Sequence, residues 1–574
     1  MPVRPDARVR DDASREREPR ARALARLAIR TASDRSDAGA IRAAGVVAVE
    51  IAGEAGAGAA STIAAAVAAV LARSDSEDVV TNAIGLAASS ASANGADTHT
   101  DIAADAGTHA AALALAGWDA PPTALEGRKG LYAVLAPGQP ESSQDWGGLV
   151  SELAAGVAAF TWDDLDENVR DAARDTFGNA AALALAASVE PAIRAAAASL
   201  TGPAADGLAL GFADPLPAEA AAFVHGSAAH LEDFDDTHLA SVVHPGAPIA
   251  GAVLAAAQRT NASGADGLAA MVAGVEIALR LGEQLPEALA RGWHITGLVG
   301  PIGAAVAVAR LAGSGVAGIA AAIDAAADRA SGITEALGTL AKPMHVGNAA
   351  RTGVRIGSGP AVPGAGGGLA RLLRSVAATP SLATSGFRIL DNVVKPYACG
   401  VLGHSSIELA LWLRERTAGR GFDRCELRVS PLAIMAMGRL DPTDGLESKF
   451  SIVHAFAVAY LYGDADPARF SDEEAVDPRV RELRDRVRLS TDEAGGRYAA
   501  TVTAFAGTET LPSLTLREAI APTGAQVRAK AARLLAGVPH AADFVTAAFR
   551  ADELDALVQL HALSAPRSDP GEHR

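Results

Sequence analysis

Small apolar side chains dominate this sequence and restrict what it can fold into. Hydrophobic residues make up 49% of the chain but aromatic residues only 4%, so a core has to be built from Ala, Val and Leu. Alanine has the highest intrinsic helix propensity, and small side chains let neighbouring helices approach closely. Most of residues 40–330 is therefore predicted to form closely packed helices. With 574 residues, the chain exceeds the ~100–200 residues of one ordinary domain, so we expect several structural units.

The net charge and the longest apolar stretches limit which kinds of partner and which cellular compartment we expect. A net charge of −17 and an isoelectric point near 5.3 argue against nucleic acid or an anionic membrane as the main partner. The net charge does not exclude an anionic small molecule as the substrate, since a basic pocket can lie inside an acidic protein. The apolar stretches 44–72 and 297–322 are interrupted by Glu50, Glu54 and Arg310, which predicts buried helices rather than membrane spans. Two cysteines give no disulfide framework, and no secretory signal is recognisable, so we expect a reduced, cytoplasmic protein.

A different pattern follows in the last third of the chain. The segments 425–431, 487–492 and 498–505 alternate apolar and polar residues and contain β-branched side chains, which predicts strands of a half-exposed sheet. Between them, the segment 449–463 predicts a helix. The expected fold class is therefore mainly α, with a large helical domain interrupted by a smaller α/β unit.

Shifts in composition place the domain boundaries. The segment 137–148 is dense in Pro, Gly and Ser and predicts a linker, and the glycine-rich run 356–368 predicts a flexible break. We expect a disordered or loosely ordered tail (1–38), an extra helical region (39–146), a helical domain with most of the site (147–385), a smaller α/β domain (386–520), and C-terminal helices with a polar tail (521–574).

The most unusual stretch of the sequence is HGSAAHLEDFDDTHLASVVHP, residues 225–245. It interleaves His225, His230, His238 and His244 with Glu232, Asp233, Asp235 and Asp236. Carboxylates this dense repel one another and retain water, so they fit poorly in a core. A solvated acidic loop would explain the carboxylates but not the histidines, so the run favours a substrate or metal site.

Taken alone, this run leaves two kinds of site open. One is a metal-dependent hydrolase, with ligands His230, Asp233, Asp235, His238 and His244. Imidazole and carboxylate are ligands that suit Zn or Mn. The other is a site without metal, in which imidazoles act as general acids and bases near neutral pH. Activity that persists in a chelator would reject the hydrolase.

Five motifs in order make residues 147–535 resemble the MmgE/PrpD family. They are HLEDFDDTHLASVVHPG (230–246), GWHITGLVGPIGAA (292–305), KPMHVGNAARTG (342–353), VKPYACGVLGHSSIELA (394–410) and KFSIVHAFAVAYLYG (449–463). That family includes 2-methylcitrate dehydratase, cis-aconitate decarboxylase and iminodisuccinate epimerase. The resemblance implies a large all-helical domain with a small α/β lid, usually in homodimers, and no required metal or organic cofactor.

The resemblance also implies a type of reaction. The family's reactions break a bond next to a carbon that carries a carboxylate, which needs a group that moves a proton and cations that hold carboxylates. We therefore expect a lyase that acts on a di- or tricarboxylate, first of all by dehydrating a 2-methylcitrate-like substrate. The alternatives are epimerisation of the iminodisuccinate type and decarboxylation of the cis-aconitate type. The decarboxylases carry a histidine soon after the lysine that matches Lys395, where this chain has Gly400 and then His404, and this departure weakens the decarboxylase interpretation.

By matching motifs, the resemblance assigns site residues. The expected catalytic residues are Asp233, His244, His294 and Lys342, and the expected substrate-binding residues are Thr237, Thr296, His345, Lys395 and Tyr397. Lysine suits the binding of carboxylates, and the backbone N–H groups at Thr296 precede a long predicted helix, where an anion can bind. Asp235 and Asp236 are expected to be helix caps or structural residues. A drifted scaffold without catalysis is a further alternative, but the retained histidines and lysines argue against it.

Residues 1–146 precede the part that resembles the family. Within them, residues 81–135 look like a degenerate second copy of the family's central segment, in which His99 falls near a histidine position but Lys342 has no counterpart. In the main copy, the glycine-rich run 356–368 replaces an expected helix and turn. The extra copy either supplies helices that the main copy lost or is a vestigial fusion. In neither case do we expect catalysis from residues 1–146.

Overall fold

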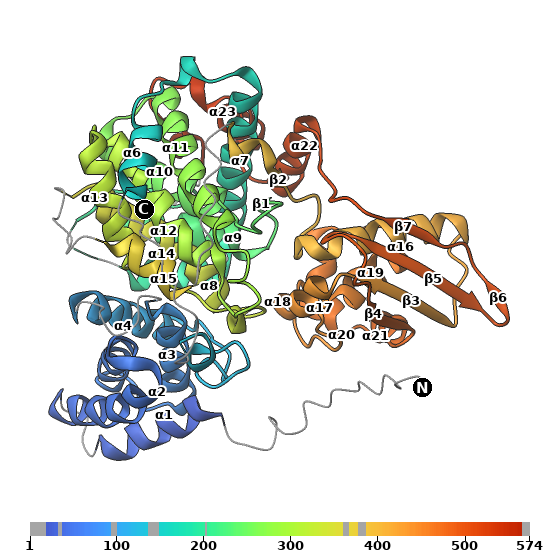
Figure 1. Cartoon of the computed structure of the whole chain (residues 1–574), viewed down its shortest axis with the longest axis horizontal. Helices are drawn as coiled ribbons and strands as arrows, with labels where there is room; N and C mark the ends of the chain where they lie inside the picture. Colours follow the sequence, from blue (N-terminus) through green and yellow to red (C-terminus); the bar gives the residue numbers. More distant parts are fainter. Residues whose placement is uncertain are drawn as a thin grey trace, which may run out of the picture.

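The structure is a computed structural model that describes residues 19–32, 37–92, 100–135, 148–200, 202, 204–359, 367–376 and 386–564. Nearly all of the predicted linker (137–148), much of the glycine-rich run 356–368, most of the predicted tail (1–38) and His99 lie outside these ranges. Figure 1 shows three parts: N-terminal helices in blue, a large helical body in cyan to yellow, and an α/β unit in orange and red. The chain is thus mainly α with a small sheet, as predicted.

The N-terminal helices form a unit of their own, here called the N-terminal unit (19–135). Its helices are α1 (Arg20–Thr31), α2 (Asp37–Leu71), α3 (Glu77–Ser90), α4 (Thr100–Leu115) and α5 (Leu131–Val134). Helix α1 lies inside the segment expected to be a tail, and its Leu24 and Ala28 are buried. Helix α2 packs along α3 and α4, so the small apolar residues of this region build a core.

The helical body comes from two separate parts of the chain. The first part holds α6 (Leu149–Ala158), α7 (Glu167–Ala186), α8 (Pro191–Ser199), α9 (Ala218–Leu231), α10 (Gly246–Thr260), α11 (Gly264–Glu283), α12 (Ile295–Leu311), α13 (Val316–Ala327), α14 (Ala341–Gly357) and α15 (Gly368–Ser375). The second part follows the α/β unit and holds α22 (Gly524–Leu534), α23 (Ala541–Ala548) and α24 (Gln559–Ser564). Helix α22 packs on α7, so the α/β unit is inserted between two parts of one body.

Left-handed residues separate neighbouring helices at two places in the body. Asn261, at φ 48°, follows α10, and Gly313, at φ 75°, follows α12. Glycine and asparagine commonly end helices in this conformation. Within the predicted helical region 40–330, the chain is therefore interrupted between α10 and α11 and between α12 and α13.

The body packs as closely as its small residues predict. A Cβ atom on Gly274 of α11 would lie 2.3 Å from the carbonyl oxygen of Gly303 in α12, and a Cβ atom on Gly303 would lie 2.6 Å from the carbonyl oxygen of Gly274. The two backbones are therefore in direct contact. This crossing tolerates no larger side chain on either helix.

Replacing Gly274 by alanine is expected to lower the free energy of unfolding by ~1–3 kcal/mol, because the new methyl group meets backbone that cannot move aside. Gly156 in α6 offers a matched control, since no atom of the described part of the chain lies within 4 Å of a Cβ built there. The Gly156→Ala variant should instead gain ~0.5–1 kcal/mol from helix propensity. Urea unfolding followed by circular dichroism measures both, and equal effects would contradict the close crossing.

The α/β unit is built on one mixed sheet with the strand order β4–β3–β5–β6, and β7 also pairs with β5. The strands are β3 (Arg424–Val429), β4 (Val487–Thr491), β5 (Ala500–Ala506), β6 (Glu509–Thr510) and β7 (Leu514–Leu516). The helices are α16 (His404–Arg416), α17 (Pro431–Met437), α18 (Gly445–Ser448), α19 (Ile452–Tyr462), α20 (Asp472–Val476) and α21 (Pro478–Asp485). The three predicted strands and the predicted helix between them are confirmed.

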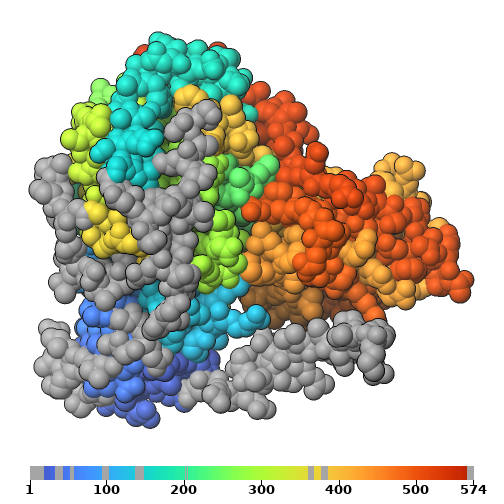
Figure 2. Space-filling model, viewed as in Figure 1, coloured from blue at the N-terminus to red at the C-terminus, as the bar shows by residue number. Residues whose placement is uncertain are grey.

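A short antiparallel ribbon ties the α/β unit to the body. Strand β1 (Asp236–His238) pairs with β2 (Asn392–Val394), with Thr237 opposite Val393. Directly after β2, the backbone N–H of Lys395 donates to the carbonyl oxygen of Asp235 at 2.9 Å. The ribbon therefore sets a lysine of one segment beside the acidic run of another. In the space-filling view the orange unit lies directly against the green part of the body (Figure 2).

Within the described residues, no single helix combines the length and apolar character needed to cross a membrane. One bent pair, Glu167–Val189 with Pro191–Ser199, meets that requirement by length and composition when its two helices are taken together.

Candidate active site

The run of histidines and acids folds at the boundary between the body and the α/β unit. It covers the second half of α9 and the following loop with strand β1, and it ends at Pro245, directly before α10. His230, Asp233, Asp235 and His244 are all buried. The alternative of a solvated acidic loop is therefore wrong: these carboxylates are not surrounded by water but matched with cations and N–H groups.

Asp233 lies between two buried lysines. Lys342 Nζ donates to Asp233 Oδ1 at 2.6 Å, and Lys395 Nζ lies 3.0 Å from the same oxygen. Burial opposes ionisation of Asp233, but the two ammonium groups hold its pKa well below the usual range. Asp233 Oδ2 finds no hydrogen-bond partner among the described residues. Asp233 lines the cavity described below, and this second oxygen is its buried acceptor without a donor.

The two lysines respond differently to this environment. Burial lowers the pKa of Lys342 below its ordinary value of 10.5, although Asp233 works in the opposite direction. Burial also acts against Lys395, but Asp233 and Asp235 together raise its pKa. Lys395 is thus a permanent cation, whereas Lys342 is the lysine better suited to give up a proton.

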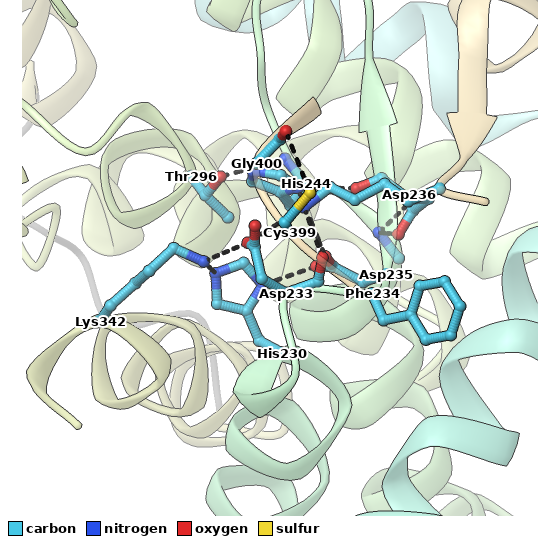
Figure 3. A network of polar contacts seen from close by, with 12 residues as sticks. His230, Asp233, Phe234, Asp235, Asp236, His244, Thr296, Lys342, Cys399 and Gly400 are labelled. Carbon is cyan, nitrogen blue, oxygen red and sulfur yellow. Dashed lines mark hydrogen bonds and ion pairs between the residues drawn. The ribbon is translucent and has the colours of Figure 1, made fainter. Parts of the chain in front are cut away.

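His230 links Lys342 to Asp235 (Figure 3). Its Nε2 lies 2.7 Å from Lys342 Nζ, and its Nδ1 lies 2.6 Å from Asp235 Oδ2. An ammonium group only donates, so the lone pair of His230 is on Nε2 and its proton on Nδ1. Burial lowers the pKa of His230 even with Asp235 beside it, which favours this neutral form. The chain Asp235–His230–Lys342 therefore fixes the direction of the lysine.

His244 is held in one tautomer by the backbone. Its Nδ1 lies 2.7 Å from the carbonyl oxygen of Asp236, which can only accept, so Nδ1 carries the proton and Nε2 the lone pair. The backbone N–H of His244 donates to Thr296 Oγ1 at 3.0 Å. Burial, joined by the positive charge of Lys395, lowers the pKa of His244 to about 3. His244 is therefore a neutral, oriented base.

A second pair of imidazoles lies nearby. His294 Nδ1 and His345 Nδ1 are 3.1 Å apart, so one donates to the other. Burial lowers the pKa of both rings, for His345 to about 3, and the neighbouring His345 lowers the pKa of His294 further. Gly332, at φ 118°, passes close to both, since a Cβ there would lie 3.2 Å from His345 Nδ1. The Nε2 atoms of both rings have no partner among the described residues.

These groups meet at a cavity of about 60 Å³ between the body and the α/β unit. Its lining combines a few polar groups with a largely apolar wall: Asp233, Val242, His244, Leu289, His294, Ile295, Thr334, Leu337, Lys342, Gly400, Val401, Leu402, Ala436, Met437 and Phe450. A concave, mainly apolar space with a few convergent polar groups is typical of a small-molecule site.

Two residues of the lining have an uncommon backbone conformation. Asp233 has φ 51° and Val242 has φ 60°. Aspartate tolerates the left-handed region, but a β-branched valine seldom adopts it. Such strain concentrates at functional sites, where the surrounding structure enforces it.

The structure separates the predicted site residues into three groups. Those that line the cavity are Asp233, His244, His294 and Lys342. Those that contact a lining residue from behind are Thr296, His345 and Lys395. The two that are not brought to the cavity are Thr237 and Tyr397. Thr237 lies in β1, and the hydroxyl of Tyr397 donates to Glu408 Oε1 at 2.6 Å.

The two acids expected to be structural differ in role. Asp236 accepts from the N–H of Gly246 at 3.0 Å and from Asn392 Nδ2 at 2.6 Å. It therefore binds the first turn of α10, and the expected capping role is confirmed for this residue. Asp235 instead accepts from His230 and lies 3.4 Å from Lys395 Nζ, inside the site.

Several residues of the site were not assigned to a metal-free site in the sequence analysis. His230 was considered only as a metal ligand, although its place in the HLEDFDD motif was a usable signal. Lys530 of α22 donates to the carbonyl oxygens of Phe234 and Lys395, and no local pattern distinguishes it from other lysines of an amphipathic helix. Met437 and Phe450 reach the cavity only through packing of the α/β unit.

The residues fit a metal ion poorly. His230, Asp235 and His244 have ligand atoms within 4.8 Å of one another, as in the metal-dependent alternative. However, Lys342 Nζ lies 2.7 Å from His230 Nε2, and a second ammonium group, that of Lys395, adjoins Asp235. Two adjacent ammonium groups repel a divalent cation. His238, a further ligand of that alternative, bonds Ser241 Oγ at 2.8 Å and does not line the cavity.

Comparison with known proteins agrees with the family resemblance that the five sequence motifs indicate. The model of the MmgE/PrpD N-terminal domain matches residues 151–358, and that of the MmgE/PrpD C-terminal domain matches residues 397–516. The cis-aconitate decarboxylase of Mus musculus is 28% identical over 305 residues, which are 48% of this chain and 61% of that protein. The cis-aconitate decarboxylase of Homo sapiens is 34% identical over 149 residues, or 24% and 30% of the two chains. The match thus spans less than two thirds of these relatives. With both of its domain models matched in order, the chain belongs to the MmgE/PrpD family.

Proposed function

We propose that this protein is a lyase that acts on a di- or tricarboxylate by general acid–base chemistry, and that its reaction is the dehydration of a 2-methylcitrate-like hydroxy acid. The observation that supports the proposal is the meeting of an oriented neutral imidazole, His244, with the ammonium group of Lys342 at one cavity. The proposal includes a homodimer that needs no metal or organic cofactor.

In this proposal His244 Nε2 takes a proton from the carbon next to a carboxylate. The electrons of that C–H bond form the C=C bond, and the C–O bond on the neighbouring carbon breaks. The Lys342 ammonium group protonates the leaving oxygen, which departs as water, and its lowered pKa suits it to this step. The unpartnered Asp233 Oδ2 can accept the hydrogen bond of the substrate hydroxyl beforehand.

The other groups support these two. Lys395 holds the charge of Asp233, and its N–H donors add to the positive field that a substrate carboxylate meets. The wall of Val401, Leu402, Met437 and Phe450 is apolar, which suits the hydrocarbon part of a methyl-bearing acid. Exclusion of water by this wall strengthens the electrostatic interactions inside the cavity.

Decarboxylation is the second candidate, because both relatives described above are named cis-aconitate decarboxylase. The ammonium group of Lys342, which lines the cavity, could protonate the carbanion that remains when carbon dioxide leaves. Against this candidate, Gly400 lines the cavity where the resemblance leads us to expect a histidine, and His404 lies outside the lining, with Nε2 3.3 Å from the carbonyl oxygen of Cys399.

Proton NMR in deuterated water with citrate, 2-methylcitrate, cis-aconitate and iminodisuccinate distinguishes these reactions. Loss of water from a hydroxy acid, undiminished in a chelator, supports the proposal. Loss of carbon dioxide from cis-aconitate would assign the second candidate instead, and deuterium incorporation without net conversion would assign an epimerase. Turnover of none of the four, or turnover that the chelator abolishes, would reject the proposal.

The pKa shifts predict an unusual pH profile for kcat/KM. His244 acts as a base only when neutral, and its pKa of about 3 keeps it neutral far below the ordinary 6.5. Activity should therefore stay level as the pH falls through 6.5. Lys342 acts as an acid only when protonated, and since its pKa lies below 10.5, activity should decline before that pH is reached. A steep loss of activity centred near 6.5, in protein still folded by circular dichroism, would contradict this assignment.

A further inference from the structure

We propose that the N-terminal unit is a working part of the active site, in which Asp119 and Lys129 are positioning residues that brace the cavity from outside. This inference rests on the proposed function for its kinetic readout. Residues 19–135 lie outside both matched domain models, and the sequence left open whether they are vestigial. Figure 2 shows the light-blue end of this unit between the green body and the orange α/β unit.

Asp119 supplies a hydrogen-bond acceptor at the start of the helix that carries Lys342. Helix α14 begins at Ala341, and its N-cap residue, Leu340, provides no side-chain hydrogen bond. Asp119 Oδ1 accepts the backbone N–H of Leu340 at 2.9 Å. A carboxylate beside the N-terminus of a helix satisfies a free N–H group there and interacts favourably with the helix dipole. Asp119 therefore fixes the first turn of α14, where Lys342 is the second residue.

A second contact braces the cavity wall formed by Thr334 and Leu337. Between these two lining residues, Glu335 Oε1 accepts from Thr123 Oγ1 at 2.6 Å and Oε2 accepts from the backbone N–H of Lys129 at 3.2 Å. A Cβ atom on Gly127 would lie 2.2 Å from Glu335 Oε1, so only glycine permits this approach. The wall is thus held by hydrogen bonds from the N-terminal unit on its outer side.

Lys129 extends the brace to the α/β unit. Its Nζ donates to the carbonyl oxygen of Met435 at 3.2 Å. Met435 lies in α17, directly before Ala436 and Met437, which line the cavity. One residue therefore contacts both the wall contributed by the body and the wall contributed by the α/β unit. We would not expect a vestigial segment to contact both walls of the cavity.

A contact elsewhere on α14 provides the control. Asp105 of α4 pairs with Arg351 at 2.8 Å and with Arg355, about two turns or more beyond Lys342. These ion pairs dock the N-terminal unit on the same helix without touching the cavity walls. Loss of Asp105 should weaken docking, whereas loss of Asp119 or Lys129 should in addition disturb the site.

The test compares substitutions in the full-length chain. Asp119→Ala is expected to lower kcat by about three- to tenfold and to shift the alkaline limb of the pH profile, because the hydrogen bond that sets Lys342 is lost. Lys129→Met should chiefly raise KM, by about three- to tenfold, because α17 is released. Asp119→Asn and Lys129→Arg, which keep the acceptor and the donor, should restore most of the wild-type values. Asp105→Ala should lower Tm with KM and the pH profile unchanged.

Amide hydrogen exchange provides a readout that needs no substrate. In Asp119→Ala, the amides of residues 334–346 should exchange faster than in Asp105→Ala. In Lys129→Met, the amides of residues 431–437 should exchange faster than in Asp105→Ala. If exchange responds in this way while the wild-type protein turns over none of the four acids, the brace stands and the proposed reaction fails. If Asp119→Ala and Lys129→Met behave like Asp105→Ala in both exchange and kinetics, the positioning role is rejected.

Discussion

The His244→Asn variant is expected to lose about 10²–10⁴-fold in kcat while remaining folded, which is the usual contribution of a general base. An asparagine amide can still donate to the carbonyl oxygen of Asp236, so the loop should keep its conformation. It cannot accept a proton from carbon. Deuterium exchange at the substrate carbon should fall together with turnover, because both depend on the same proton transfer.

His238→Asn is the matched control for His244→Asn. It lies in the same run and is buried, but its Nδ1 bonds Ser241 and its ring is not part of the cavity lining. This variant should keep its turnover, with any cost confined to stability. Full turnover by His244→Asn on the true substrate would overturn the assignment of the base and, with it, the proposed mechanism.

The Lys342→Met variant is expected to lose about 10²–10⁴-fold in kcat, because it lacks the proposed acid. The substitution also removes one of the two cations beside the buried Asp233, and breaking a buried ion pair costs ~3–5 kcal/mol of stability. Lys342→Arg should not restore turnover, since guanidinium stays protonated and has a different shape. Steady-state kinetics and urea unfolding separate the two effects.

Lys449→Met controls for the loss of a buried lysine. Lys449 is buried and pairs with Glu232 at 2.8 Å, but it does not belong to the cavity lining. This variant should lose stability with a much smaller change in kcat. A fall in kcat as large as that of Lys342→Met would show that the activity follows general loosening of the interface and not the proton of Lys342.

Local sequence patterns predicted the helices and strands in which apolar residues recur at a clear period. Strands β3, β4 and β5 lie close to where their apolar alternation places them, and α19 lies within the predicted helix 449–463. Strands β1 and β2 were not predicted, because three residues are too few to show alternation. Lys395 was nevertheless assigned to the site from its motif, although its position there depends on this unpredicted ribbon.

The sequence motifs identified the polar residues of the site better than the apolar residues that shape the cavity. Asp233, His244, His294 and Lys342 line the cavity, whereas Thr237, which was assigned from the same motif as Asp233, does not. In a strand, its side-chain direction is decided by the pairing of β1 with β2. Met437 and Phe450 have no local signal, because they reach the cavity through the packing of two units.

The contacts of Asp119 and Lys129 show a further limit of sequence. The N-terminal segment was expected to carry no catalytic residue; among its described residues, none lines the cavity. Its contacts with Leu340 and Met435 span more than two hundred residues of chain. Contacts at such separation follow from how folded units dock, which no local spacing reveals.

The return of the chain to the helical body through α22 has a consequence for its synthesis. Lys530 satisfies the buried carbonyl oxygens of Phe234 and Lys395, and α22 packs on α7, so the loops of the site lack these partners until the last segment is available. On the ribosome, the inserted α/β unit can fold as soon as it emerges, but the body around it has to wait for the end of translation. A released chain that ends at residue 520 should therefore hold a protease-resistant sheet beside an unfinished bundle.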